Sequence, residues 1–148
     1  MKYTEKISNK LNELLEKNYD AEKGYLNAAK NVESAKLKIF FKNRASERSQ
    51  FAKELRTEIL LHGQIPEDSG TFKGTVHRNW MTLKSLFSAN DEVAILEEAI
   101  RGERANLEEY KEILLEDAFA LSTRKMIEEQ QQKIQAAINL LMVKEELA

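Results

Sequence analysis

VAILEEAIRGERANLEEYKEIL, residues 93–114, repeats its apolar side chains at alternating steps of three and four. This spacing predicts an α-helix with one apolar face. The residues on that face are Val93, Leu96, Ile100, Glu103, Leu107, Tyr110 and Leu114. Glu103 lies in its middle, and a carboxylate removed from water is costly unless a partner compensates it. The stretch therefore predicts a core helix that carries a polar site.

Three other long stretches have the same periodicity, so we expect long helices at about 5–32, 33–62, 91–116 and 122–146. Residues 63–74, GQIPEDSGTFKG, hold the only Pro and three of the five Gly, and a shorter helix is expected at about 76–87. Short links within each half of the chain predict antiparallel helix pairs. The predicted fold is a single all-α domain, 1–148, in which a long crossover containing the short helix joins the two pairs of a four-helix bundle.

Composition excludes several classes of function. The chain has 23 Lys and Arg against 25 Asp and Glu, a net charge of −2, so we expect no nucleic-acid partner. It has no Cys, which removes disulfides, thiolate metal sites and cysteine nucleophiles. No apolar run is long enough to cross a bilayer, and the N-terminus lacks the apolar core of a secretion signal. We expect a soluble cytoplasmic protein without a membrane partner.

The other three helices also have polar side chains near the middle of their apolar faces. These are Asn18 with Glu22, Glu47, and Gln130. If the four faces share one core, these side chains and Glu103 could fall at a similar level. Converging carboxylates repel one another unless a cation, a proton or a basic side chain compensates them. The candidates for a compensating basic side chain are Arg44, Arg48 and Arg101.

Two interpretations of this polar level compete. In the first, it is a metal site whose ligands are Glu22, Glu47, Gln50, Glu103 and Gln130, holding a divalent metal such as Fe, Mn, Mg or Zn. Di-iron bundles use Glu-x-x-His pairs, which this chain lacks at its helix centres, so an oxygen-only set suits a hard cation better. In the second, which we favour, it is a buried ion-pair network or a water-filled gap. Catalytic residues are not predicted.

Five strings carry a resemblance to a known family: DAEKGY (20–25), ERSQFAKEL (47–55), PEDSGT (66–71), HRNWMTLK (77–84) and RGE (101–103). From about Ile7 to Glu116 the chain resembles the uncharacterised bacterial ferritin-like family labelled domain of unknown function 2383. The resemblance implies a ferritin-like bundle and makes a metal site worth testing, but the family has no assigned activity. Ile138 stands where members of the family often have a His.

The sequence thus favours a structural or partner-binding bundle, with a metal-binding ferritin-like protein as the alternative. Tyr19, Leu26 and Leu15 form a second apolar stripe on the first helix. We expect these side chains to lie on the outside and to support a homo-oligomer.

Overall fold

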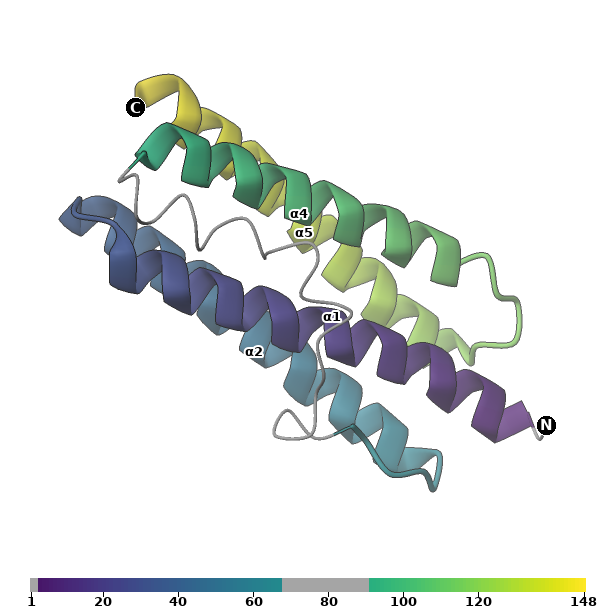
Figure 1. Cartoon of the computed structure of the whole chain (residues 1–148). Helices are drawn as coiled ribbons and strands as arrows, with labels where there is room; N and C mark the ends of the chain where they lie inside the picture. Colours follow the sequence, from purple (N-terminus) through teal and green to yellow (C-terminus); the bar gives the residue numbers. More distant parts are fainter. Residues whose placement is uncertain (1–2, 68–90) are drawn as a thin grey trace.

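The computed structural model describes residues 3–67 and 91–148. Four long helices make up this part of the chain: α1 (Tyr3–Asn31), α2 (Ala35–Leu61), α4 (Glu92–Ile113) and α5 (Leu121–Leu147) (Figure 1). The predicted all-α four-helix bundle is confirmed, and the helix bounds differ from the predicted ones by a few residues. The predicted short helix at 76–87 lies outside the described residues.

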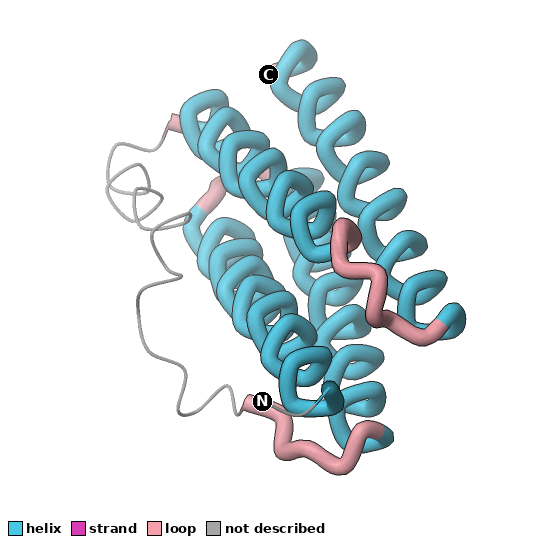
Figure 2. The backbone as a smooth tube through the Cα atoms, turned by 90° about the vertical axis from the view of Figure 1, so that its right-hand side faces the viewer, coloured by secondary structure: helices cyan, strands magenta, loops and turns pink. Residues whose placement is uncertain are grey.

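Each helix pair is an antiparallel hairpin, and the two hairpins pack side by side (Figures 1 and 2). Lys6 near the start of α1 forms a 3.1 Å ion pair with Glu116, just beyond the end of α4. At the opposite end, the backbone N–H of Ser34 donates to Glu92 Oε2 at 3.2 Å. Hence α1 is antiparallel to α4, and α2 and α4 run in the same direction on opposite corners. The end of α2 and the start of α4 therefore lie at opposite ends of the bundle.

Local signals in the sequence set the helix ends. The side chains of Ser34 and Asp91 cap α2 and α4 by accepting from the N–H groups of Leu37 and Ala94. Beyond α2, Gly63 adopts a φ of 73°, and its N–H and that of Gln64 bond back to the last turn, as in a Schellman motif. The predicted end of this helix at about 62 is confirmed.

The last helix begins close to its predicted start. It was expected to begin at about 122 and begins at Leu121, and Ala120 at its cap position has no side-chain hydrogen bond. Thr123 instead donates its hydroxyl to the Glu58 carboxylate of α2. The Thr123 side chain therefore makes a tertiary contact between α5 and α2.

The apolar core consists of two clusters, one toward each end of the bundle. The first includes Leu11, Leu14, Phe51, Leu55, Leu107, Tyr110, Ile134 and Ile138. The second includes Ala21, Tyr25, Phe41, Ala45, Ile95, Leu96, Ile100 and Leu141. On α2 and α4 the division falls at Arg48 and Glu103, and on α1 it falls between Tyr19 and Ala21, next to Asn18. Asn18, Arg48 and Glu103 are all buried. A polar level thus crosses the middle of the core, as the sequence predicted.

Some predicted faces are shifted at their edges. Val93, assigned to the apolar face of its helix, has an exposed fraction of 37%. Tyr19 and Leu15, expected on the outside, are buried in the first cluster, and only Leu26 of that stripe is exposed. Tyr19 is covered because its hydroxyl donates to the backbone oxygen of Glu67 at 2.9 Å, which folds the start of the crossover back onto α1.

Gly63→Ala should lower stability without changing the fold. A Cβ at this position meets no atom within 4 Å, so the only penalty is the left-handed backbone, about 1–2 kcal/mol. The expected fall in Tm is a few degrees, measured by circular dichroism. Gly63→Asn is the control and should lose less, because Asn tolerates this conformation better. An unchanged Tm in both variants would contradict the role given to Gly63.

Candidate functional site

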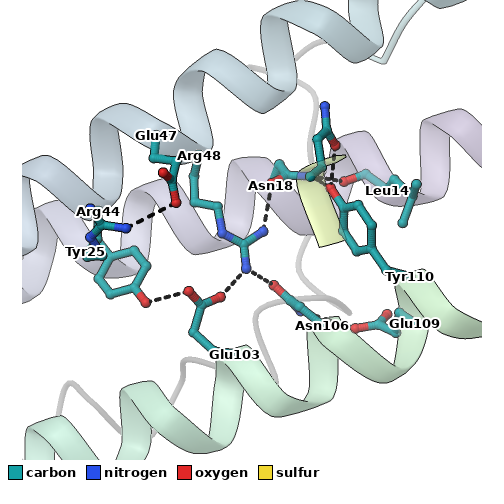
Figure 3. A network of polar contacts seen from close by, with 11 residues as sticks. Leu14, Asn18, Tyr25, Arg44, Glu47, Arg48, Glu103, Asn106, Glu109 and Tyr110 are labelled. Atoms are coloured by element: carbon teal, nitrogen blue, oxygen red, sulfur yellow. Dashed lines mark hydrogen bonds and ion pairs between the residues drawn. The ribbon is translucent and has the colours of Figure 1, made fainter. Parts of the chain in front are cut away.

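Arg48 is the centre of the candidate site. Its guanidinium comes from the middle of α2, and only 1% of the residue is exposed. One Nη atom donates to Asn18 Oδ1 on α1 at 2.7 Å, and the other donates to Asn106 Oδ1 on α4 at 3.0 Å and to the Glu103 carboxylate (Figure 3). Three acceptors from two other helices therefore surround one cation.

Glu103 is the only acidic member of this arrangement and is as buried as Arg48. One of its oxygens accepts from Arg48, and the other accepts from the hydroxyl of Tyr25 on α1 at 2.8 Å (Figure 3). In the described part of the chain, α2 and α4 make no close backbone contact. The long Arg side chain is therefore what links these two diagonal helices.

A chain of neutral side chains extends the site to the fourth helix. The Asn18 amide donates to the Tyr110 hydroxyl at 2.8 Å, and that hydroxyl donates to Gln130 Oε1 on α5 at 2.6 Å. The Gln130 amide donates at 2.9 Å to Oε1 of Glu54, a half-buried residue of α2. We call the buried residues among these the core polar network: Asn18, Tyr25, Arg48, Glu103, Asn106, Tyr110 and Gln130. All four helices contribute to it.

Electrostatics keeps the tyrosines of the network neutral and Arg48 charged. Burial and the neighbouring Glu103 raise the pKa of Tyr25 well above its ordinary value, and burial raises that of Tyr110 to about 12. For Arg48, burial is the largest single effect and favours the neutral form, but the Glu103 carboxylate together with the Tyr110 and Tyr25 oxygens outweighs burial, so the pKa is raised. The network therefore contains one positive and one negative charge, which compensate each other.

The structure brings together only part of the predicted ligand set. Glu103 and Gln130 belong to the network, where both hydrogen-bond to other protein groups. Glu47 is half-buried and pairs with Arg44 at 3.0 Å, one turn before Arg48. Glu22 is half-buried on α1, and Gln50 is exposed, with its amide 3.5 Å from Glu54 Oε2.

Of the three arginines considered as compensating charges, Arg48 has this role. Arg44 bonds to Glu47, and Arg101 bonds to Glu98 on the surface.

Sequence reasoning missed Asn106. It lies three residues after Glu103 and so on the same helix face, which is the signal that could have identified it. Ile138, where the resemblance suggested a family His, is buried in the first apolar cluster.

Two properties of residues 3–67 and 91–148 bear on function. No three His, Cys, Asp or Glu side chains in these ranges lie in an arrangement that could hold a metal ion. None of the four helices described is both long and apolar enough to cross a membrane.

Asp20 is a buried ionisable side chain outside the core polar network, 2% exposed, on α1 two residues after Asn18. Burial raises its pKa to about 7; Lys17 and Lys23 oppose this shift, and Glu109 of α4 adds to it. Asp20 therefore titrates close to neutral pH in the folded protein.

These features define a class: a four-helix bundle with one long crossover and an ion pair buried within a four-helix hydrogen-bond network. The chain belongs to the family described as "Domain of unknown function (DUF2383)", whose model matches residues 6–116. The match spans α2, α4, nearly all of α1 and the connection between the hairpins, and it confirms the family resemblance. A comparison with curated proteins finds no match.

A double-mutant cycle should show that Arg48 and Glu103 act as one unit. Arg48→Met and Glu103→Gln should each lower the free energy of unfolding by about 3–5 kcal/mol, because each leaves buried polar groups of its partner without compensation. The double variant should lose clearly less than the sum. Urea denaturation measures all three. Purely additive losses would show that the two side chains stabilise the fold independently.

Asp20→Asn should make the protein less sensitive to pH between about 4 and 7. The folded pKa of about 7 exceeds the ordinary value of 3.8, so the folded state binds more protons in this window. The stability that protonated Asp20 contributes is therefore complete below pH 4 and is lost as the pH rises through 7. The wild type should lose stability relative to Asp20→Asn along this interval, measured by urea denaturation at stepped pH. A difference that stays constant with pH would contradict the raised pKa.

Proposed function

We propose that this protein is a non-enzymatic bundle that acts by binding a partner, and that the partner is a second copy of the chain. The observation that carries the proposal is the Arg48–Glu103 pair. The carboxylate that is most deeply buried in the core already binds a guanidinium, and its second oxygen accepts from Tyr25. This favours a structural role for the core and leaves the surface as the functional part.

An outer face of α5 supports a contact with another copy. Leu140, Val143 and Leu147 follow one another at steps of three and four, so they lie on one side of the helix. Their exposed fractions are 47%, 52% and 79%. Large apolar side chains grouped on a surface favour association, and symmetric homodimers are the commonest assemblies of soluble proteins.

We further assign the bundle to the ferritin-like group, because two antiparallel hairpins joined by one long crossover are the connectivity of that group. A cytoplasmic location fits the absence of Cys.

Light scattering of matched variants tests the dimer. Leu140→Glu places a charge on the proposed contact, whereas Leu26→Glu places the same charge on α1 at a position of nearly equal exposure, 48% against 47%. The wild type and Leu26→Glu should be dimers, and Leu140→Glu should be a monomer. A wild type that is monomeric at all concentrations would refute the dimer. Dissociation by Leu26→Glu alone would place the contact on α1.

The alternative function is metal binding by Glu22, Glu47, Gln50, Glu103 and Gln130. Elemental analysis of protein purified without chelator separates the two proposals. Bound Fe, Mn, Mg or Zn that is lost in Glu103→Ala would favour the alternative. Metal-free protein whose Tm does not respond to these ions favours the structural core.

A further inference from the structure

We infer that the middle of the core is a guanidinium-binding cage whose ligand is the chain's own Arg48. The cage consists of the Glu103 carboxylate, Asn106 Oδ1 and Asn18 Oδ1, all on helices other than the one that carries Arg48. The cage and its ligand therefore come from separate parts of the structure, as in a protein that binds a free ligand.

The geometry of the cage matches a planar fork of donors. Asn18 Oδ1 accepts from one Nη atom at 2.7 Å, while Asn106 Oδ1 accepts from the other at 3.0 Å and shares it with Glu103. A guanidinium presents its N–H groups in one plane and in several directions at once, whereas an ammonium is a compact point charge. Acceptors on two sides of the cation thus favour guanidinium over ammonium.

The orientation of each acceptor is fixed by a second contact. The Tyr25 hydroxyl donates at 2.8 Å to Oε2 of Glu103, the carboxylate oxygen that does not accept from Arg48. The Asn18 amide donates to Leu14 O and to Tyr110, which turns its oxygen toward Arg48. The Asn106 amide donates to Glu109 Oε1 at 3.1 Å, with the same effect. These contacts hold the three oxygens in place independently of Arg48, so the cage is preorganised.

Charge also selects the ligand. The cage has one carboxylate and two neutral amide oxygens, and burial keeps the tyrosines around it neutral. The cage therefore has a net charge of −1, which a monovalent cation neutralises. A divalent ion without water would leave one positive charge buried and uncompensated. The cage is built from contacts within one chain and does not require a second copy to bind at the surface.

Chemical rescue tests the cage. Arg48→Ala removes two methylenes and the guanidinium, and ethylguanidinium supplies the same atoms. Ethylguanidinium at about five times its Kd should raise the Tm of this variant by about 2–4 °C. Ethylammonium carries the charge without the fork, and N-ethylurea has the planar shape without the charge, so neither should have this effect. Wild type, whose cage is filled, should not respond.

Arg48→Ala combined with Glu103→Gln is the control for the binding site, and it should lose the response to ethylguanidinium. If Arg48→Ala alone does not fold, the helicity gained on adding ethylguanidinium becomes the readout. Equal effects of all three compounds, a response that survives in the double variant, or no response at all would overturn the proposal. A response to Mn²⁺ in place of ethylguanidinium would identify the emptied cage as a metal site instead.

A measurement on the wild type does not depend on any variant. If the cage holds the guanidinium as the contacts indicate, the Arg48 Nη protons should give separate, slowly exchanging signals in ¹⁵N-resolved spectra. Arg104, on the exposed side of α4, is the internal comparison. Arg48 signals averaged like those of Arg104 would refute a tightly bound guanidinium.

Discussion

The ion pair between Arg48 and Glu103 is the constraint on which the rest of this bundle depends. It joins α2 to α4, two diagonal helices without close backbone contact, through a side chain that crosses the core. A buried charge that loses its partner is strongly destabilising. The helices must therefore take positions along their axes that bring residue 48 to residue 103. The apolar side chains pack around that position, since apolar contacts alone are less selective about sliding.

The pair also divides the core. The two apolar clusters meet at the level of Asn18, Arg48 and Glu103, so each hairpin carries apolar, polar and apolar segments in turn. Sliding one hairpin along the bundle axis would set its polar segment against an apolar segment of the other hairpin. Tyr110 and Gln130 continue the network to α5, which ties the last helix to the same level. The network therefore specifies how the hairpins associate, while the clusters supply most of the favourable free energy.

Much of the candidate site could be predicted from sequence. Glu103 stood out because its position in an apolar stripe fixed its burial, and Asn18 and Gln130 stood out for the same reason. Arg48 was one of three candidates, since a residue's place on a helix does not say which neighbour its long side chain reaches. Glu47 and Gln50 were put forward on α2, but Glu47 is only half-buried and Gln50 is exposed, because the centre of the buried face lies at Arg48. Asn106 was missed because Asn residues inside helices are common. Its role as an acceptor depends on Arg48, which comes from α2.

The sequence by itself determined the four helices, most of their ends and the presence of polar residues at the middle of the core. These follow from periodicity and from local capping, which neighbouring residues decide. Tertiary structure alone decided that the charge at the centre comes from Arg48, that Thr123 binds Glu58, and that Tyr19 is buried. Each of these depends on which residue of another helix lies opposite. The order of residues along one helix does not encode that pairing.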